Sequence, residues 1–157
     1  MGIGNGMAGD DALGAWAINH FDTNQSGGVE VIDAGLSGWN LLDLMDGAKA
    51  VILVDAILSA QAPGTIHRLE IPRDLNRLKK QEWSSNLSST HSFGLAETLI
   101  LGETLGLLPS TVIVFGIEIQ QATIGESPSP STLQAMADLH VHISQEIEAL
   151  TCMNSNS

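Results

Sequence analysis

The sequence has little that would cross-link the chain or bind nucleic acid. It contains a single cysteine, Cys152, which excludes an internal disulfide and any metal site built from several cysteines. Lysine and arginine number 6, against 18 aspartate and glutamate residues, and the formal net charge is −12. Because a nucleic-acid site needs clustered basic side chains to neutralise phosphates, this balance argues against a nucleic-acid partner.

Long apolar runs are also missing. Stretches such as residues 51–54 are short and are bounded by charge or glycine, whereas a membrane-spanning helix needs about 20 apolar residues. No basic segment followed by an apolar one marks a secretory signal. We therefore expect a soluble, cytoplasmic protein that does not contact a membrane. The length of 157 residues suits one domain, which we place at 1–152, with 153–157 as a disordered tail.

Strand and helix periodicities alternate along the chain, which predicts an α/β fold. The clearest strand contains the continuous apolar run 50–54, typical of a parallel strand buried on both faces. In the first half of the chain we expect a short first strand before Gly4, a helix from near Asp10, a strand at 29–34, a helix around 39–45, and strands at 49–57 and 65–71. An irregular polar segment at 73–90 follows, then a helix at 93–107 and a strand at 111–119. The last element is a helix from Pro130, capped by Ser129, to about Leu150. This order predicts a three-layer sandwich with a mostly parallel, twisted sheet of about five strands flanked by helices.

Polar residues that follow the strands mark one edge of this sheet as the candidate site, because ligands bind outside the carboxyl ends of strands in open α/β sheets. The residues in question are Asn5, Asp11, Asp33, Asp55 and His91. Each alone also fits an ordinary role as a cap, a turn residue or a packed histidine. Asp55 is the most informative, since an ionised carboxylate at the end of a buried strand needs a partner. Two aspartates and a histidine suit a divalent first-row metal, without distinguishing nickel from zinc, iron or manganese.

Other motifs in the sequence favour different chemistry less well. Residues 4–9 fit the G-x-G-x-x-G pattern of dinucleotide-binding loops, but Asp10 and Asp11 would repel a pyrophosphate at the helix start. Residues 35–38 lack the spacing of a G-x-S-x-G nucleophile elbow. The hydroxyls of residues 88–90 lie beside His91 in sequence, which is not triad geometry. We expect structural roles for the other histidines, which are His20, His67, His140 and His142.

Several short motifs follow one another in order over residues 2–130. They are Gly2-Ile3-Gly4-Asn5 with Gly9-Asp10-Asp11-Ala12-Leu13-Gly14, Asp33-Ala34-Gly35-Leu36-Ser37-Gly38, Val54-Asp55-Ala56 followed by Pro63-Gly64-Thr65, Ser89-Thr90-His91 with Gly94-Leu95, Gly116-Ile117-Glu118, and Ser129-Pro130. Together these motifs resemble those of the hydrogenase maturation endopeptidases. Two departures stand out. Only three residues precede Gly4, so we expect a shortened central strand or a misassigned start, and Ile119 stands where a proline commonly follows Gly-Ile-Glu.

The resemblance implies an endopeptidase that removes the C-terminal extension of a nickel-loaded [NiFe] hydrogenase large-subunit precursor. Nickel carried by the substrate would be the recognition element, so no tightly bound cofactor of the protein's own is expected. The family's nickel-contacting residues correspond to Asp11, Asp55 and His91, with supporting loop residues Asn5, Gly35 and Gly38. We expect a monomer whose partner is the precursor.

The resemblance leaves the chemistry of bond scission open. Docked nickel or a carboxylate would activate water, with Asp33 as the general base that we name, or with Asp11 and Asp55 as the working pair. The reaction would be aspartate- or metal-assisted, and not of serine or cysteine type. The alternative function is a non-enzymatic divalent-metal-binding maturation module of the same fold.

Overall fold

The computed structural model describes residues 1–3, 13–21, 28–35, 40–59, 61–79, 94–120 and 129–154. The elements within these ranges are β1 (Gly2–Ile3), α1 (Leu13–Asn19), β2 (Asp33–Gly35), α2 (Leu41–Met45), β3 (Ala50–Ile57), β4 (Ile66–Ile71), α3 (Leu75–Lys79), α4 (Leu95–Leu105), β5 (Thr111–Glu118) and α5 (Pro130–Asn154). The central strands and α4 agree with the predicted bounds to within about two residues. Asp10, where the first helix was expected to start, lies outside the described residues.

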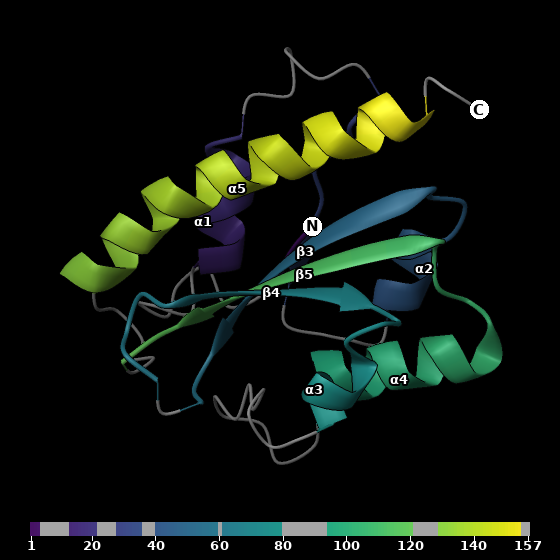
Figure 1. Cartoon of the computed structure of the whole chain (residues 1–157), viewed down its shortest axis with the longest axis horizontal. Helices are drawn as coiled ribbons and strands as arrows, with labels where there is room; N and C mark the ends of the chain where they lie inside the picture. The colour runs from purple at the N-terminus through teal and green to yellow at the C-terminus, as the bar shows by residue number, and fades with distance from the viewer. Residues whose placement is uncertain are drawn as a thin grey trace.

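The five strands form one sheet in the order β2-β1-β3-β5-β4. All neighbouring pairs are parallel except β4 and β5, which are antiparallel. The connection from β3 to β4 is too short for a crossover, so β4 cannot run parallel. Helices α1 and α5 cover one face of the sheet and α2, α3 and α4 cover the other (Figure 1). The predicted three-layer, mostly parallel sandwich is confirmed.

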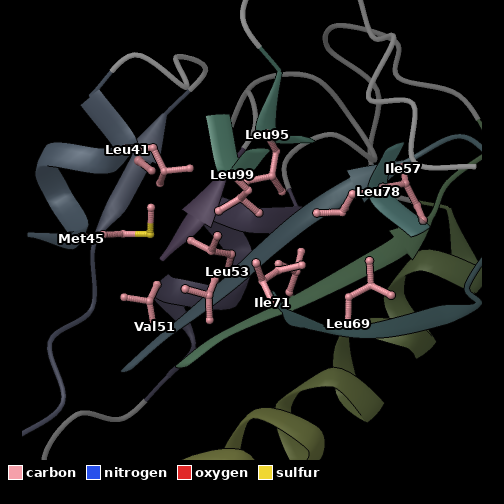
Figure 2. Close-up of a cluster of buried hydrophobic side chains, with 13 residues drawn as sticks. Leu41, Met45, Val51, Leu53, Ile57, Leu69, Ile71, Leu78, Leu95 and Leu99 are labelled. Atoms are coloured by element: carbon pink, nitrogen blue, oxygen red, sulfur yellow. The ribbon is translucent and has the colours of Figure 1, made fainter. Parts of the chain in front are cut away.

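Each face of the sheet carries its own apolar core, because successive side chains of a strand point to opposite faces. On the face covered by α2, α3 and α4, the odd-numbered residues Val51, Leu53 and Ile57 of β3 join one buried cluster (Figure 2). On the face covered by α1 and α5, Val54 and Ala56 join the other. This double burial explains the continuous apolar run from which the strand was predicted.

The segment 73–90 was predicted to be irregular, and this is wrong for its beginning. Helix α3 forms there, and Leu78 is 3% exposed within the apolar cluster of Figure 2. Leu75 packs against the same cluster, because residues three apart share a helix face. The two leucines were hidden among basic and polar neighbours. Residues 80–93 lie outside the described ranges.

The second strand is shorter than predicted. Residues 29–34 were expected to form it, but β2 begins at Asp33. The physical reason is its neighbour: β1 pairs with β2 from Gly2 onward, and the Ile32 carbonyl accepts the Gly2 N–H, so residues 29–31 have no residue of β1 beside them. Instead they face a cavity of about 480 Å³, which is also lined by Met1, by residues 50–52 of β3 and by Ile143, Ile147 and Leu150 of α5.

The last helix begins as predicted and ends later. Pro130 is its first residue, and Ser129 Oγ accepts the Thr132 backbone N–H at 3.3 Å. The helix continues to Asn154, past the predicted end near Leu150 and past the boundary placed at 152, because no glycine or proline interrupts it. None of the described helices is long and apolar enough to cross a membrane.

Candidate active site

Asp55 brings a carboxylate to the carboxyl edge of the sheet. It follows the apolar residues of β3, which lies between β1 and β5, and it is 3% exposed. By strand alternation its side chain belongs to the face of Leu53 and Ile57. Eight residues of β3 pair with β5, so the backbone that carries Asp55 is held along its whole length. This is the place where open α/β sheets bind ligands.

One register row joins Asp55 to a histidine across the sheet. Asp55 pairs with Gly116 of β5, and Gly116 pairs with His67 of β4. Partners in register project to the same face, and two strand spacings separate the outer backbones by roughly 10 Å. Gly116 has no side chain, so within this register row only Asp55 and His67 contribute side chains to this face. His67, which was expected to have only a structural role, therefore shares the row of Asp55.

Glu118 lies two residues after Gly116 in β5 and therefore projects to the same face as this row. It ends β5 and is 1% exposed. Its Oε2 accepts the Ser59 backbone N–H at 3.0 Å, its Oε1 accepts the Ser59 hydroxyl, and His67 Nε2 lies 3.4 Å from Oε1. Each carboxylate oxygen therefore accepts a hydrogen bond from Ser59. This suits an ionised carboxylate, because such a group can only accept hydrogen bonds.

Sequence reasoning quoted Glu118 in a motif but gave it no role. The signal was present: a carboxylate ends the apolar run 112–117, just as Asp55 follows the run 50–54. His67 and Ser59 carried no such signal, because only the pairing of distant strands brings them to Glu118.

Asp33 lies apart from this group. It is the first residue of β2, its side chain is exposed, and its Oδ1 accepts the Gly35 backbone N–H at 2.9 Å. Gly35 adopts a left-handed backbone, with φ of 62°, which glycine allows without strain. Register places Asp33 opposite Gly2, whose other partner is Val54. Strand β1 thus separates Asp33 from β3, and alternation turns it toward the other face of the sheet. Its role as general base stays a prediction.

The remaining predicted site residues are Asp11, His91, Asn5 and Gly38, and they lie outside the described residues. Two of them precede described helices in the sequence. Asp11 precedes α1, and His91 precedes α4, whose Leu95 belongs to the apolar cluster of Leu53 and Ile57. Within the described ranges no three His, Cys, Asp or Glu side chains form a metal site. The structure therefore shows where Asp55 lies, and the metal-ligand role of Asp11, Asp55 and His91 stays a prediction.

Comparison with known proteins decides the family. Residues 18–148 match the model of a family described as hydrogenase maturation protease. The chain belongs to the hydrogenase maturation protease family. The resemblance drawn from the short motifs is thereby confirmed.

Individual relatives of this family differ in how much of their length the chain covers. The hydrogenase 2 maturation protease of Escherichia coli is 30% identical over 146 residues, which cover 88% of this chain and 82% of the relative. The hydrogenase expression/formation protein HupD of Thiocapsa roseopersicina is 29% identical over 123 residues, which cover 75% of this chain and 52% of the relative. The chain thus spans about half the length of that second relative.

Solved structures of family members share the fold. The hydrogenase maturating endopeptidase HybD from E. coli has a TM-score of 0.75 at 24% identity, covering 94% of this chain and 90% of that one. The [NiFe] hydrogenase maturation protease HycI from Thermococcus kodakarensis has a TM-score of 0.68 at 21% identity, covering 94% and 89%. The described sheet and its flanking helices therefore form the fold that was predicted.

Proposed function

We propose that this protein is an endopeptidase that removes the C-terminal extension of a nickel-loaded [NiFe] hydrogenase large-subunit precursor. Membership of the hydrogenase maturation protease family over residues 18–148 supports the reaction class. The observation that carries the site is the buried carboxylate of Asp55, held at the carboxyl edge of a central strand. We place the reaction in the cytoplasm, between a monomer and its precursor.

Nickel in this proposal belongs to the substrate. Asp11, Asp55 and His91 would offer two carboxylates and an imidazole, a ligand set that divalent first-row metals accept while keeping open positions. The precursor's own ligands would fill the other positions. Because the enzyme supplies only part of the coordination, docking is strong only for a precursor that already carries nickel. Binding strength then acts as a check on loading.

Hydrolysis of the peptide bond needs a base for water and an acid for the departing amine. Asp33 is one proposed base, and Asp11 with Asp55 is the other arrangement. The position of Cys152 disfavours a cysteine nucleophile. It lies exposed in the last turn of α5, and its neighbours Leu150 and Thr151 line the cavity beside residues 50–52, at the sheet edge opposite Asp55.

The test compares a nickel-loaded large-subunit precursor with a nickel-free one, each incubated with the purified protein and weighed by intact mass spectrometry. Loss of a short C-terminal peptide from the loaded precursor alone is the expected result. Asp11→Ala, Asp55→Ala and His91→Ala should each slow this cleavage by about 100-fold or more, because metal sites lose on the order of 10–100-fold even from changes to outer partners.

A matched control is Asp138→Ala, an exposed carboxylate of α5 on the other face of the sheet. It should cleave the loaded precursor at the wild-type rate. Thermal unfolding of each variant checks that the buried Asp55 has been replaced without loss of the fold. A correctly loaded precursor that keeps its full mass would sink the peptidase proposal. Nickel-dependent binding without cutting would point to a maturation module instead.

A further inference from the structure

Glu118 is a buried carboxylate that the proposed scission chemistry does not use. At 1% exposure it is closed to a docking precursor. Its side chain nevertheless has partners from two other segments of the chain. Ser59 donates both its backbone N–H and its hydroxyl to the two carboxylate oxygens, and His67 Nε2 lies 3.4 Å from one of them. A buried polar group satisfied in this way fixes the segments that supply its donors.

The main chain of the same residue holds a further part of the β3–β4 connection, of which the structure describes residues 58–59 and 61–65. The Gly64 N–H donates to the Glu118 carbonyl at 2.7 Å, and the Glu118 N–H donates to the Thr65 carbonyl at 2.9 Å. The side chain of Glu118 thus holds the start of the connection through Ser59, and its backbone holds the end. The connection leaves β3 shortly after Asp55, at the same edge of the sheet.

We propose that Glu118 is a positioning residue for precursor docking. By holding Ser59 it fixes the β3–β4 connection beside Asp55, and this connection forms a rigid wall of the surface on which the loaded precursor docks. The inference rests on the proposed function, since it names how that site is kept in shape. Glu118 acts through Ser59 and not on nickel or on the scissile bond.

The chemistry of the contact explains why a carboxylate is needed there. Glutamine has nearly the same shape, but one of its two terminal groups is an NH₂ donor. With its amide oxygen at the Oε2 position, glutamine still accepts the Ser59 N–H, while its NH₂ group donates to the Ser59 hydroxyl, which has to turn from donor to acceptor. Both bonds then lack the negative charge and are weaker than charge-assisted ones. The Ser59 segment would be held less firmly while the apolar neighbours of Glu118 in β5 stay packed. Glu118→Gln should therefore weaken docking more than it weakens the fold.

Steady-state cleavage of the loaded precursor separates these effects. For Glu118→Gln the KM should rise about tenfold, as expected when charge-assisted hydrogen bonds are replaced by neutral ones, while kcat changes less. A merely structural role would lower the folded fraction, which reduces the maximal rate and leaves KM unchanged. That second result would overturn the proposal.

Variants of Ser59 provide a second comparison. Ser59→Ala removes the hydroxyl but keeps the backbone donor, so its KM should also rise above that of wild type. Ser59→Thr keeps both donors and should keep the wild-type KM. Glu146→Gln is the control. Glu146 lies on α5, which covers the opposite face of the sheet, and it pairs with Arg68 of β4. Its KM should not change.

Two further readouts keep this proposal separate from the peptidase proposal. Amide hydrogen exchange at Ser59 should be faster in Glu118→Gln than in wild type, with exchange at Val114 in the centre of β5 unchanged. Equal exchange at Ser59 in both proteins would overturn the inference.

The second readout is direct binding of the loaded precursor, which tests the inference even if the protein does not cleave the precursor. Binding without cutting defeats only the peptidase proposal, and about tenfold weaker binding by Glu118→Gln would still support positioning; absence of binding by wild type defeats both.

Discussion

Single residues make a very close backbone contact possible where α1 crosses β1. Gly2 and Gly14 meet there with no side chain between them. A Cβ added at Gly14 would lie 2.1 Å from the Ile3 carbonyl oxygen, and one at Gly2 would lie 2.0 Å from the Gly14 oxygen. These neighbours are backbone atoms of a strand and a helix, so neither can move aside. The contact also fixes the helix that follows Asp11 in the chain.

Gly14→Ala should therefore lower the free energy of unfolding by about 3 kcal/mol or more, at the upper end for overpacked sites. Gly102→Ala in α4 is the matched control, because its Cβ would meet only side-chain ends, Leu108 Cδ2 at 2.6 Å and Leu42 Cδ2 at 2.7 Å. Alanine gains about 1 kcal/mol of helix propensity at either position, which should largely offset the control's strain. Urea denaturation of both variants measures the difference. Equal losses would contradict the argument.

The residues of the site differ in how far sequence could reveal them. Asp55 follows a continuous apolar run, and this local pattern was enough to find it. Glu118 ends a similar run, but its carboxylate binds Ser59, which is 59 positions away in the sequence. His67 joins the group only through the antiparallel register of β4 and β5. No local pattern reports such a pairing, so these two partners had to come from the structure.

Helices and strands also differ in whether their bounds follow from local sequence or from pairing with distant segments. The cores of β3 and β5 were predictable because each is long and apolar, and β4, with three polar residues among its six, was predicted at similar bounds. The bounds of β2 were not, because residues 29–31 form a strand only if β1 lies beside them. Helix α3 was missed since only Leu75 and Leu78 mark it within a polar segment. Pairing and packing therefore decided what periodicity could not.

The turn that links β4 to α3 carries a prediction about pH. Asp74 Oδ2 accepts the Glu70 backbone N–H at 3.0 Å, and this bond, together with Arg73 nearby, lowers the pKa of Asp74 below its usual 3.8. An aspartate with a lowered folded-state pKa stabilises the fold above the unfolded value, and this contribution is lost as pH falls through the folded pKa. Ionised Asp74 should thus support the turn at neutral pH and not in strong acid.

Asp74→Asn should lower the free energy of unfolding by about 0.5–1 kcal/mol near pH 7, a small effect because solvent screens the turn. The difference from wild type should shrink as the pH falls below 3.8. Urea denaturation at several pH values tests this, with Asp138→Asn on exposed α5 as the control. A difference that stayed constant into the acid range would show that the charge of Asp74 is not its cause.

The whole molecule has two unlike sheet edges. The carboxyl edge gathers the ionisable side chains of Asp55, His67 and Glu118. At the opposite edge, where the parallel strands begin, lies the largely apolar cavity of about 480 Å³. It continues the line of β1 beyond Met1, between residues 29–32 and residues 50–52. The amine of Met1 lies there and donates to the Ile52 carbonyl at 2.7 Å, and burial lowers its pKa from 8.0 to about 6.

Filling this cavity should stabilise the whole fold. Gly2 pairs with Asp33 and Val54, so three residues placed before Met1 would lie between residues 29–31 and residues 50–52 in parallel register. An added Val-Ile-Val, after an initiator methionine, should raise the free energy of unfolding by about 2 kcal/mol, since burial of each side chain gains about 1.5–3 kcal/mol and ordering each residue costs about 1–2 kcal/mol. A Gly-Ser-Gly extension of equal length is the control.

The pH dependence of this gain provides an independent check on the same cavity. The folded chain ending at Met1 binds fewer protons than the unfolded chain between pH 6 and 8, because burial depresses the amine's pKa. Its stability should therefore rise as the pH increases through that interval. Both extensions convert the amine to a peptide N–H, so the slope should disappear in both, whereas only the Val-Ile-Val extension should protect the amides of residues 29–31 from exchange. If both extensions gave the same melting temperature and the same amide protection, the cavity would not be a strand position.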